Sequence, residues 1–307
     1  MQEVHVCASA KVNPALFVGP VGDDGFHELD IFFESIDIFD DIYAYATDSN
    51  DIKLEVEGDL AGTVPTDSSN LAVKAAQALR DAYGVEKGVR LRIVKRIPVA
   101  GGLAGGSADA AGTLLACNEL WQLGLSQEEL MKLGATLGSD IPFCLLGSLA
   151  RASGRGTVLT GMKPGTMHFW VLVSFDEGLS TPAIYRHLDE LRDKRGEMAD
   201  LEHVKVKADK VHRTLEGDNI DAIGECLHND LAEAAISMRP ELQKIIDKAQ
   251  EFSVKAVVSG SGPTIAVLAR EYSEANALAG ALSNEFPHAR IIRANGPAAG
   301  AHIRSSR

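Results

Sequence analysis

A run of small residues between a strand pattern and a helix pattern is the feature that constrains this chain most. Residues 98–112 read PVAGGLAGGSADAAG, after alternating apolar residues at 89–93 and before apolar residues at helical spacing over 110–121. Glycine lets the backbone approach a ligand closely, and the free N–H groups at the start of a helix face an anion. The segment therefore predicts an anion-binding loop, with a close packing contact between strand and helix as the alternative.

Two common phosphate-binding motifs do not fit this segment. The dinucleotide-binding pattern GxGxxG needs glycines at offsets 0, 2 and 5, and no register of the segment supplies them. A P-loop ends in Gly-Lys-Ser/Thr, whereas Gly106 is followed by Ser107 and Ala108. The catalytic motifs of protein kinases are missing as well. A dehydrogenase, a P-loop enzyme and a protein kinase are therefore disfavoured.

The charge balance argues against a general nucleic-acid binder. The 307 residues include 30 Lys and Arg against 43 Asp and Glu, a formal net charge of −13, whereas nucleic-acid binders usually present a basic face. The sequence contains no run of about 18 apolar residues, so no membrane span is predicted. The start of the chain lacks the pattern of a secretory signal. We expect a cytoplasmic protein with no nucleic-acid or membrane partner.

The cysteines and the secondary-structure patterns indicate an ordinary mixed fold. The four cysteines are far apart and form no CxxC pair, which argues against a disulfide framework or a zinc site. Strand patterns fill residues 4–8, 29–46 and 52–57, and a helix pattern begins at Leu71 and stops at Gly84. Ser126 and Glu129 form a capping-box pattern. Because strands and helices follow no strict βαβ rhythm, an α+β fold is favoured over a doubly wound sheet.

Three segments in order resemble the GHMP kinases, a superfamily named for galactokinase, homoserine kinase, mevalonate kinase and phosphomevalonate kinase. The glycine-rich segment is similar to their phosphate loop, residues 10–13 (AKVN) match near the N-terminus, and residues 258–263 (VSGSGP) match near the C-terminus. Residues 24–29 (DGFHEL) and 137–143 (LGSDIPF) are similar to one branch of the superfamily. That branch phosphorylates the 2-hydroxyl of a cytidine-diphosphate-linked methylerythritol, in the non-mevalonate isoprenoid pathway.

The resemblance implies a two-domain α+β fold with the active site in the cleft between the domains. The N-terminal, ATP-binding domain would span residues 1–161 and the C-terminal domain residues 162–307. ATP and Mg²⁺ are expected, with a small cytidine diphosphate molecule as the partner; the oligomeric state stays open. The residues that the resemblance assigns to ATP are Pro98, Val99, Ala100, Gly101, Gly102, Leu103, Ala104, Gly105, Gly106 and Ser107.

The resemblance also assigns roles to single residues. Asp140 would accept the proton of the attacking hydroxyl or orient that hydroxyl, and Lys11 would sit beside it and neutralise the transferred phosphoryl group. The residues expected to bind the substrate are Asn13, Phe26, His27 and Tyr185, with the two aromatic rings of Phe26 and Tyr185 stacking on cytosine. Without the resemblance, Asp140 is a turn residue before Ile-Pro and Lys11 a solvated lysine.

Two departures from the usual branch pattern stand out. Phe26 occupies a position where tyrosine is usual, so ring stacking survives and the hydroxyl is lost. Ala104 occupies a position where glycine is common, which makes the backbone there less adaptable. Two alternatives remain: a kinase of the same superfamily that acts on homoserine or mevalonate, and a non-catalytic nucleotide-binding sensor with the same fold.

Overall fold

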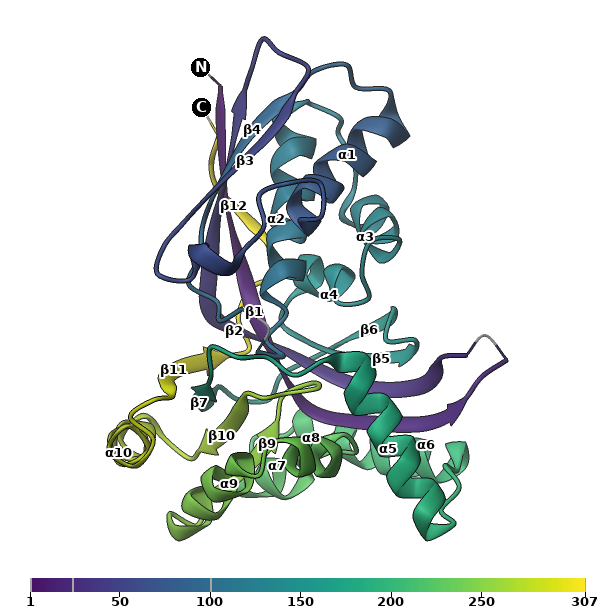
Figure 1. Cartoon of the computed structure of the whole chain (residues 1–307), viewed down its shortest axis with the longest axis vertical. Helices are drawn as coiled ribbons and strands as arrows, with labels where there is room; N and C mark the ends of the chain where they lie inside the picture. Colours follow the sequence, from purple (N-terminus) through teal and green to yellow (C-terminus); the bar gives the residue numbers. More distant parts are fainter. Residues whose placement is uncertain (1, 24, 100, 307) are drawn as a thin grey trace.

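Two long strands form an antiparallel hairpin that runs through the whole molecule (Figure 1). The computed structural model describes residues 2–23, 25–99 and 101–306. Strands β1 (Glu3–Val21) and β2 (His27–Ala46) pair along most of their length, with register shifts between Ser9 and Ala10 and between Val12 and Ala15. Irregularities of this kind bend a strand and re-aim its side chains. Here they flank the segment that carries Lys11 and Asn13.

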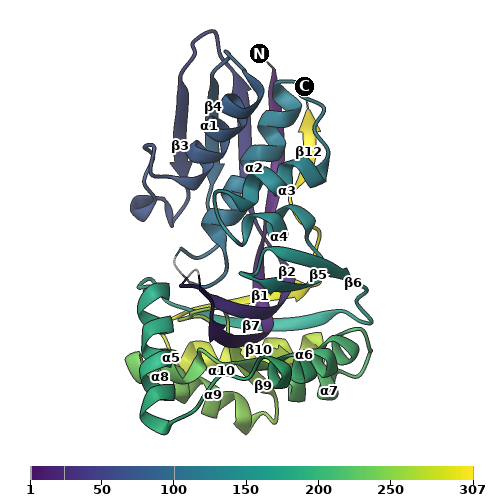
Figure 2. The same ribbon diagram turned by 90° about the vertical axis from the view of Figure 1, so that its right-hand side faces the viewer.

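The N-terminal half is a mixed sheet with helices on one face (Figures 1 and 2). The sheet has eight strands, with the order β12-β1-β2-β4-β3; β5 and β6 extend from β2, and β8 pairs with β1. Helices α1 to α4 cover one face, and α2 lies closest to the hairpin. Its Gly112 packs on Ile42, where a Cβ atom would come within 2.7 Å of the Ile42 side chain. This helix carries the glycine-rich segment at its N-terminus.

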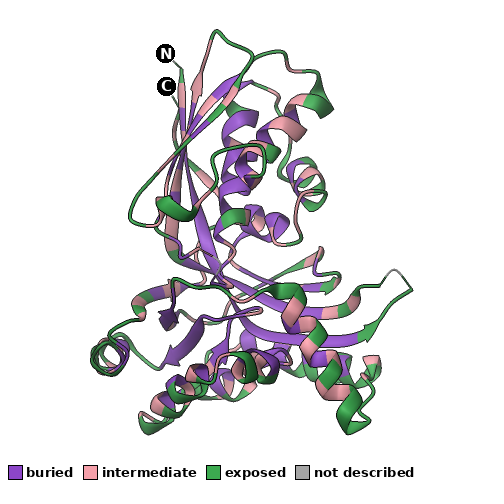
Figure 3. Cartoon of the chain, viewed as in Figure 1, coloured by how far each residue is buried: buried purple, intermediate pink, exposed green. Residues whose placement is uncertain are grey.

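The C-terminal half is a smaller antiparallel sheet, ordered β11-β7-β10-β9, with α9 and α10 packed on it, while α6 of the same half packs on β1 and β2 (Figures 1 and 2). Leu16, Val18 and Phe33 from the hairpin belong to the same apolar cluster as the inner residues of this sheet. In Figure 3 the buried part of the hairpin continues from one half into the other. The hairpin therefore contributes to the hydrophobic cores of both halves.

The strands are β1, β2, β3 (Ile52–Glu57), β4 (Val89–Val94), β5 (Leu149–Gly154), β6 (Val158–Met162), β7 (His168–Ser174), β8 (His228–Asn229), β9 (Lys255–Val258), β10 (Ile265–Ala269), β11 (Arg290–Gly296) and β12 (His302–Ser306). The helices are α1 (Leu71–Tyr83), α2 (Gly105–Leu120), α3 (Gln127–Ala135), α4 (Ile141–Leu146), α5 (Thr181–Arg195), α6 (Leu201–Leu215), α7 (Ile220–Cys226), α8 (Ala232–Met238), α9 (Glu241–Glu251) and α10 (Tyr272–Glu285). None of the helices in the described ranges is long and apolar enough to cross a membrane.

Local signals in the sequence are confirmed. Helix α1 ends at Gly84, which adopts a left-handed conformation with φ 64°. Both hydrogen bonds of the capping box at Ser126 and Glu129 are present. The α+β class is confirmed as well, because antiparallel pairs dominate both sheets. Strand β12 returns to pair with β1, so the last described residues, up to Ser306, lie on the first sheet. The domain division at residue 161, which falls within β6, stays a prediction.

A buried glutamate joins the hairpin to the smaller sheet. Glu34 on β2 is fully buried and lies 2.7 Å from Nδ1 of His168, and Nε1 of Trp170 donates a hydrogen bond of 2.9 Å to its other oxygen. Gly296 on β11 leaves room for this carboxylate, since a Cβ atom there would lie 2.1 Å from Oε1. A buried carboxylate is tolerated because both of its oxygens are hydrogen-bonded. Glu34 therefore holds the two sheets in one relative position.

Candidate active site

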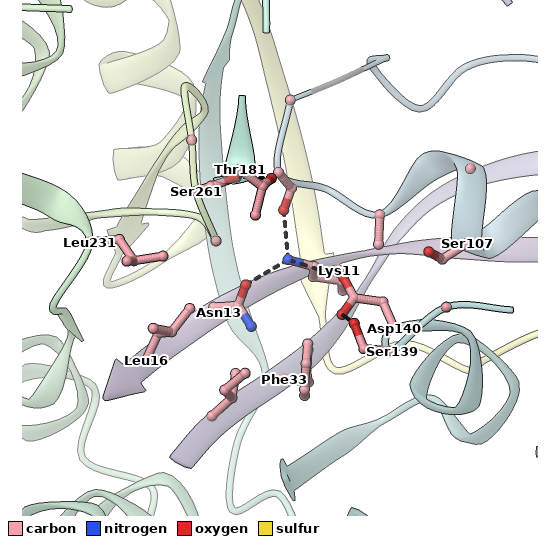
Figure 4. Close-up of a pocket in the computed structure, with 18 of the residues that line it drawn as sticks. Lys11, Asn13, Leu16, Phe33, Ser107, Ser139, Asp140, Thr181, Leu231 and Ser261 are labelled. Atoms are coloured by element: carbon pink, nitrogen blue, oxygen red, sulfur yellow. Dashed lines mark hydrogen bonds and ion pairs between the residues drawn. The ribbon is translucent and has the colours of Figure 1, made fainter. Parts of the chain in front are cut away.

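The side chain of Lys11 lies at the junction of the hairpin, the glycine-rich loop and α4 (Figure 4). Its ammonium donates hydrogen bonds to Oδ1 of Asn13 (2.6 Å) and to the carbonyl oxygen of Gly102 (2.7 Å). The backbone N–H of Lys11 also donates to the carbonyl oxygen of Leu103. Asn13 is itself held by a bond from its amide to the carbonyl oxygen of Phe32. The ammonium therefore has a fixed position.

Asp140 supplies the negative charge that faces this ammonium. Its Oδ2 lies 3.9 Å from Nζ of Lys11, and the two side chains are 30% and 4% exposed. Burial lowers the pKa of Lys11, and the nearby carboxylate of Asp140 opposes that shift. Although Asp140 precedes α4, its side chain makes no capping hydrogen bond to that helix. The carboxylate thus faces the cavity, which the turn interpretation of Asp140 does not require.

The glycine-rich loop and the start of α2 line the same cavity. The helix begins at Gly105, within the glycine-rich segment. Gly102 has φ +77°, and a Cβ atom there would lie 2.2 Å from the carbonyl oxygen of Ser259. Glycine is therefore required at this position by both backbone angle and contact. Among the other predicted loop residues, Leu103 is buried in the core, and Ala100 lies outside the described residues.

The turn between β9 and β10 closes the loop from the C-terminal half. Ser259 Oγ donates a hydrogen bond of 3.1 Å to the carbonyl oxygen of Gly102. Asn229 donates to the carbonyl oxygens of Val258 and Gly260, both at 2.7 Å, and so fixes the turn. Residues 258–263, which the sequence links only loosely to the site, thus contact the phosphate-loop candidate directly.

A buried lysine between two aspartates holds the glycine-rich end of α2 against the sheet. Lys95, which follows β4, lies 2.5 Å from Asp40 of β2 and 2.7 Å from Asp109 of α2. The remaining oxygen of Asp40 accepts the backbone N–H groups of Arg96 and Ile97. Burial raises the pKa of Asp109 to about 8, although the Lys95 charge acts to lower it. This network ties the first turn of α2 to the sheet.

These elements enclose a cavity of about 510 Å³. The predicted site residues that line it are Lys11, Asn13, Gly101, Gly102, Ala104, Gly105, Gly106, Ser107, Asp140 and Tyr185. Pro98 and Val99 are not among the lining residues. In Figure 4 the Lys11 ammonium lies between Asn13 and Asp140, while Thr181 and Ser261 approach from the C-terminal half. The hydroxyls of Thr181 and Ser261 are 2.8 Å apart, so α5 and the β9–β10 turn meet at the rim of the cavity.

A second cavity of about 770 Å³ adjoins the first and shares five lining residues with it: Leu29, Ser139, Arg155, Thr181 and Tyr185. Phe26, His27 and Tyr185 all line it, so the structure brings Tyr185 together with two predicted substrate residues that are far from it in sequence. The rings of His27 and Tyr185 lie 5.2 Å apart, and Nε2 of His27 lies 2.9 Å from Asp189. Burial raises the pKa of Tyr185.

Arg155 lines both cavities, and the sequence interpretation did not predict it. Its guanidinium lies 4.1 Å from the centre of the Phe26 ring, an arrangement typical of a cation–π contact. No spacing in the sequence marks an arginine 129 positions away from its aromatic partner. Lys95 and Asp109 were missed too, although a charged residue within an apolar helix is a usable signal for a buried partner.

Comparison with known proteins agrees with this architecture. The family described as GHMP kinases N terminal domain matches residues 70–148, and the family described as GHMP kinases C terminal matches residues 211–288. Among solved structures, a homoserine kinase from Cytophaga hutchinsonii superposes with a TM-score of 0.78 at 16% identity and covers 98% of this chain and 97% of its own. At that identity the similarity concerns the fold.

Full-length relatives narrow the class. A 4-diphosphocytidyl-2-C-methyl-D-erythritol kinase of Cutibacterium acnes is 44% identical, covering 98% of this chain and 96% of the relative. One of Streptomyces coelicolor is 42% identical, covering 98% and 99%. A crystal structure of 4-(cytidine 5'-diphospho)-2C-methyl-D-erythritol kinase has a TM-score of 0.74 at 29% identity, covering 95% of this chain and 99% of that one.

The fold and the two matching domains are those of a GHMP kinase. Within that class, the chain belongs to the family of 4-diphosphocytidyl-2-C-methyl-D-erythritol kinases. The family resemblance inferred from the sequence motifs is thereby confirmed, and the homoserine and mevalonate alternatives are disfavoured.

Ala104, the departure in the glycine loop, generates a prediction about stability. Its φ of 59° lies in the left-handed region, which costs a residue other than glycine about 1–2 kcal/mol. Ala104→Gly removes that cost. The glycine also gives the unfolded chain more conformational freedom, which lowers the stability of the folded state by about 0.4–1 kcal/mol. We therefore expect the free energy of unfolding to rise by a net amount of roughly 0.5–1 kcal/mol. Urea unfolding measures it.

Ala108 provides the matched control for this substitution. It lies in the same helix with no exposed surface and helical geometry, so Ala108→Gly should destabilise the protein by about 1 kcal/mol or more. If Ala104→Gly lowered the unfolding free energy as Ala108→Gly does, the left-handed strain at Ala104 would be ruled out.

Proposed function

We propose that the protein transfers the γ-phosphoryl group of ATP to the 2-hydroxyl of 4-diphosphocytidyl-2-C-methyl-D-erythritol, with Mg²⁺ bound to the nucleotide. The observation that carries the proposal is one cavity that joins the Lys11–Asp140 pair to the glycine-rich start of α2. The names of its full-length relatives support the choice of substrate. Action in the cytoplasm, without nucleic-acid or membrane partners, remains a prediction from the sequence.

Lys11 and Asp140 divide the work of the transfer. Asp140 accepts the proton of the attacking hydroxyl or aligns that hydroxyl, because its carboxylate faces the cavity and caps no helix. Lys11 stabilises the negative charge on the transferred group, since its ammonium is buried and fixed by Asn13 and Gly102. Positioning and charge stabilisation are what phosphoryl transfer needs most from a protein.

The start of α2 fits the phosphates of ATP. Gly105, Gly106 and Ser107 provide backbone N–H groups at a helix N-terminus that opens into the cavity. A Cβ atom at Gly106 would meet only the Leu71 side chain, at 3.6 Å, so the wall here is open backbone. Oxygen donors suit Mg²⁺, and the Ser107 hydroxyl is one that lines the cavity. When bound, Mg²⁺ would neutralise phosphate charge.

The second cavity fits the cytidine portion of the substrate. A flat base stacks on aromatic rings, and Phe26 and Tyr185 both line this cavity. His27, positioned by Asp189, offers a polar ring to the edge of the base. Because the cavity adjoins the one that holds Asp140, the polyol end of such a molecule would extend toward the reacting groups.

An acceptor panel tests the proposed function. Purified protein with ATP and Mg²⁺ should release ADP with 4-diphosphocytidyl-2-C-methyl-D-erythritol and not with homoserine, mevalonate or buffer alone. ADP release with another alcohol would show that the protein is a kinase and that the proposed substrate is wrong. If no acceptor gave ADP while ATP still bound, the nucleotide-sensor alternative would replace the catalytic one.

Substitution of Asp140 tests the catalytic role. We expect Asp140→Asn to lower kcat by about 10²–10⁴-fold, because the amide cannot accept the hydroxyl proton, while the dissociation constant for ATP stays within about twofold. Steady-state kinetics and nucleotide binding provide the two values. Asp193→Asn, an exposed change on α5, should leave both unchanged. Wild-type turnover in Asp140→Asn would remove this carboxylate from catalysis.

Substitution of Phe26 tests the stacking role. Loss of one base–aromatic contact costs about 1–3 kcal/mol, so Phe26→Ala should raise the KM for the cytidine substrate roughly 5–150-fold with little change in kcat. Phe26→Tyr, the residue usual in related sequences, keeps the ring and should stay close to wild type. An unaltered KM in Phe26→Ala would place the cytosine elsewhere.

A further inference from the structure

Three metal-binding side chains meet on the hairpin away from the catalytic cavity. His5 and Cys7 are two residues apart on β1, and Asp41 on β2 pairs directly with Cys7. Alternate residues of a strand, and directly paired residues of neighbouring strands, share one face of a sheet. All three side chains therefore project from the same face, and none of them lines either cavity of the candidate active site.

The donor atoms already have nearly the spacing of a metal site. Nε2 of His5 lies 2.8 Å from Oδ1 of Asp41, and Sγ of Cys7 lies 3.1 Å from the same oxygen and 3.9 Å from the His5 nitrogen. Tetrahedral Zn²⁺ with ordinary bond lengths separates such donors by about 3.4–3.6 Å. Each observed separation differs from that range by no more than about 0.6 Å, which small side-chain rotations can supply.

Neighbouring residues orient these donors as outer partners orient the ligands of known metal sites. The second oxygen of Asp41 accepts a hydrogen bond of 2.5 Å from Arg96, which leaves Oδ1 directed at His5 and Cys7. The His5 ring stacks on Tyr43 with centroids 4.3 Å apart. Partners of this kind fix the geometry of metal ligands and raise the affinity of the site.

The burial of the cluster suits an ion held by three side chains. The side chains of His5 and Asp41 are 18% and 13% exposed, and Cys7 is 6% exposed. His5 is the most exposed of the three ligands, so the donors are nearest to solvent on its side, while the buried sulfur provides a low-dielectric side. One thiolate and one carboxylate balance the two positive charges of the ion, and Arg96 faces the far oxygen of Asp41.

We propose that His5, Cys7 and Asp41 form a binding site for Zn²⁺, with water in the fourth position. A mixed imidazole, thiolate and carboxylate set is typical of Zn²⁺ and unlike the all-oxygen sets of Mg²⁺ and Ca²⁺. On binding, the Cys7 thiol releases its proton to solvent as the zinc–sulfur bond forms, and His5 contributes a nitrogen lone pair. The absence of a CxxC pair does not bear on such a site, because its donors come from two strands.

The proposed site is separate from catalysis. Cys7 and Lys11 are four residues apart on β1, which is about 13 Å along a strand. Bound Zn²⁺ would link β1 to β2 near the end of the hairpin where both chain termini lie (Figure 1). We therefore expect the ion to stabilise the folded protein and to leave phosphoryl transfer unchanged.

The test titrates tag-free, chelator-treated protein with Zn²⁺ alone, by calorimetry and by competition with a chromophoric chelator. Wild type should bind one equivalent specifically, and Cys7→Ser and His5→Ala should each weaken binding at least about 100-fold, no less than the loss of an outer partner does. Cys226→Ser is the matched control, because Cys226 is a half-exposed cysteine on α7, and it should titrate like wild type.

Two further measurements separate this site from adventitious surface binding. Co²⁺ should give a sulfur-to-metal charge-transfer band in wild type that Cys7→Ser abolishes, and Zn²⁺ should raise the unfolding temperature of wild type but not of Cys7→Ser. Circular dichroism checks that each variant is folded. Equal Zn²⁺ affinity in folded Cys7→Ser and wild type, or no stoichiometric binding to wild type, would overturn the proposal.

Discussion

The buried contact of Lys95 with Asp40 and Asp109 is the interaction on which the site depends. It joins β2, the residues after β4 and the start of α2 through side chains that are at most 4% exposed. Removing Lys95 from this network costs about 3–5 kcal/mol, because carboxylate charge is then left buried without a cationic partner. The network is therefore costly to rearrange, and it fixes the position of the start of α2 relative to the hairpin.

A second buried contact fixes the C-terminal half so that its β9–β10 turn reaches the glycine-rich loop. Glu34 fixes the small sheet to the hairpin through His168 and Trp170. With that orientation set, Ser259 of the β9–β10 turn donates a hydrogen bond to the carbonyl oxygen of Gly102, and the Lys11 ammonium donates another to the same oxygen. One backbone carbonyl thus accepts hydrogen bonds from both halves. The geometry of the cavity follows from two buried polar anchors rather than from apolar packing alone, which specifies position less sharply.

Sequence patterns predicted the local structure and the motifs well, and the long-range contacts poorly. The strand at 89–93 and the end of α1 at Gly84 depend on neighbouring residues, so they could be predicted. That Lys11 and Asp140 are neighbours came from family resemblance, since no spacing law relates residues 129 positions apart. Arg155 above Phe26 and the partners of Lys95 escaped notice because register and bulges decide such contacts.

The hairpin explains why one strand can serve several purposes at once. Along β1, His5, Cys7, Lys11 and Asn13 follow one alternation, and the last two line the cavity. The register shift between Val12 and Ala15 adds a residue to β1 and so changes that alternation. Farther along, Leu16 and Val18 enter the core of the smaller sheet. A regular strand would keep one alternation throughout. The irregular pairing lets nineteen residues contribute in turn to an outer face, a polar site and a second core.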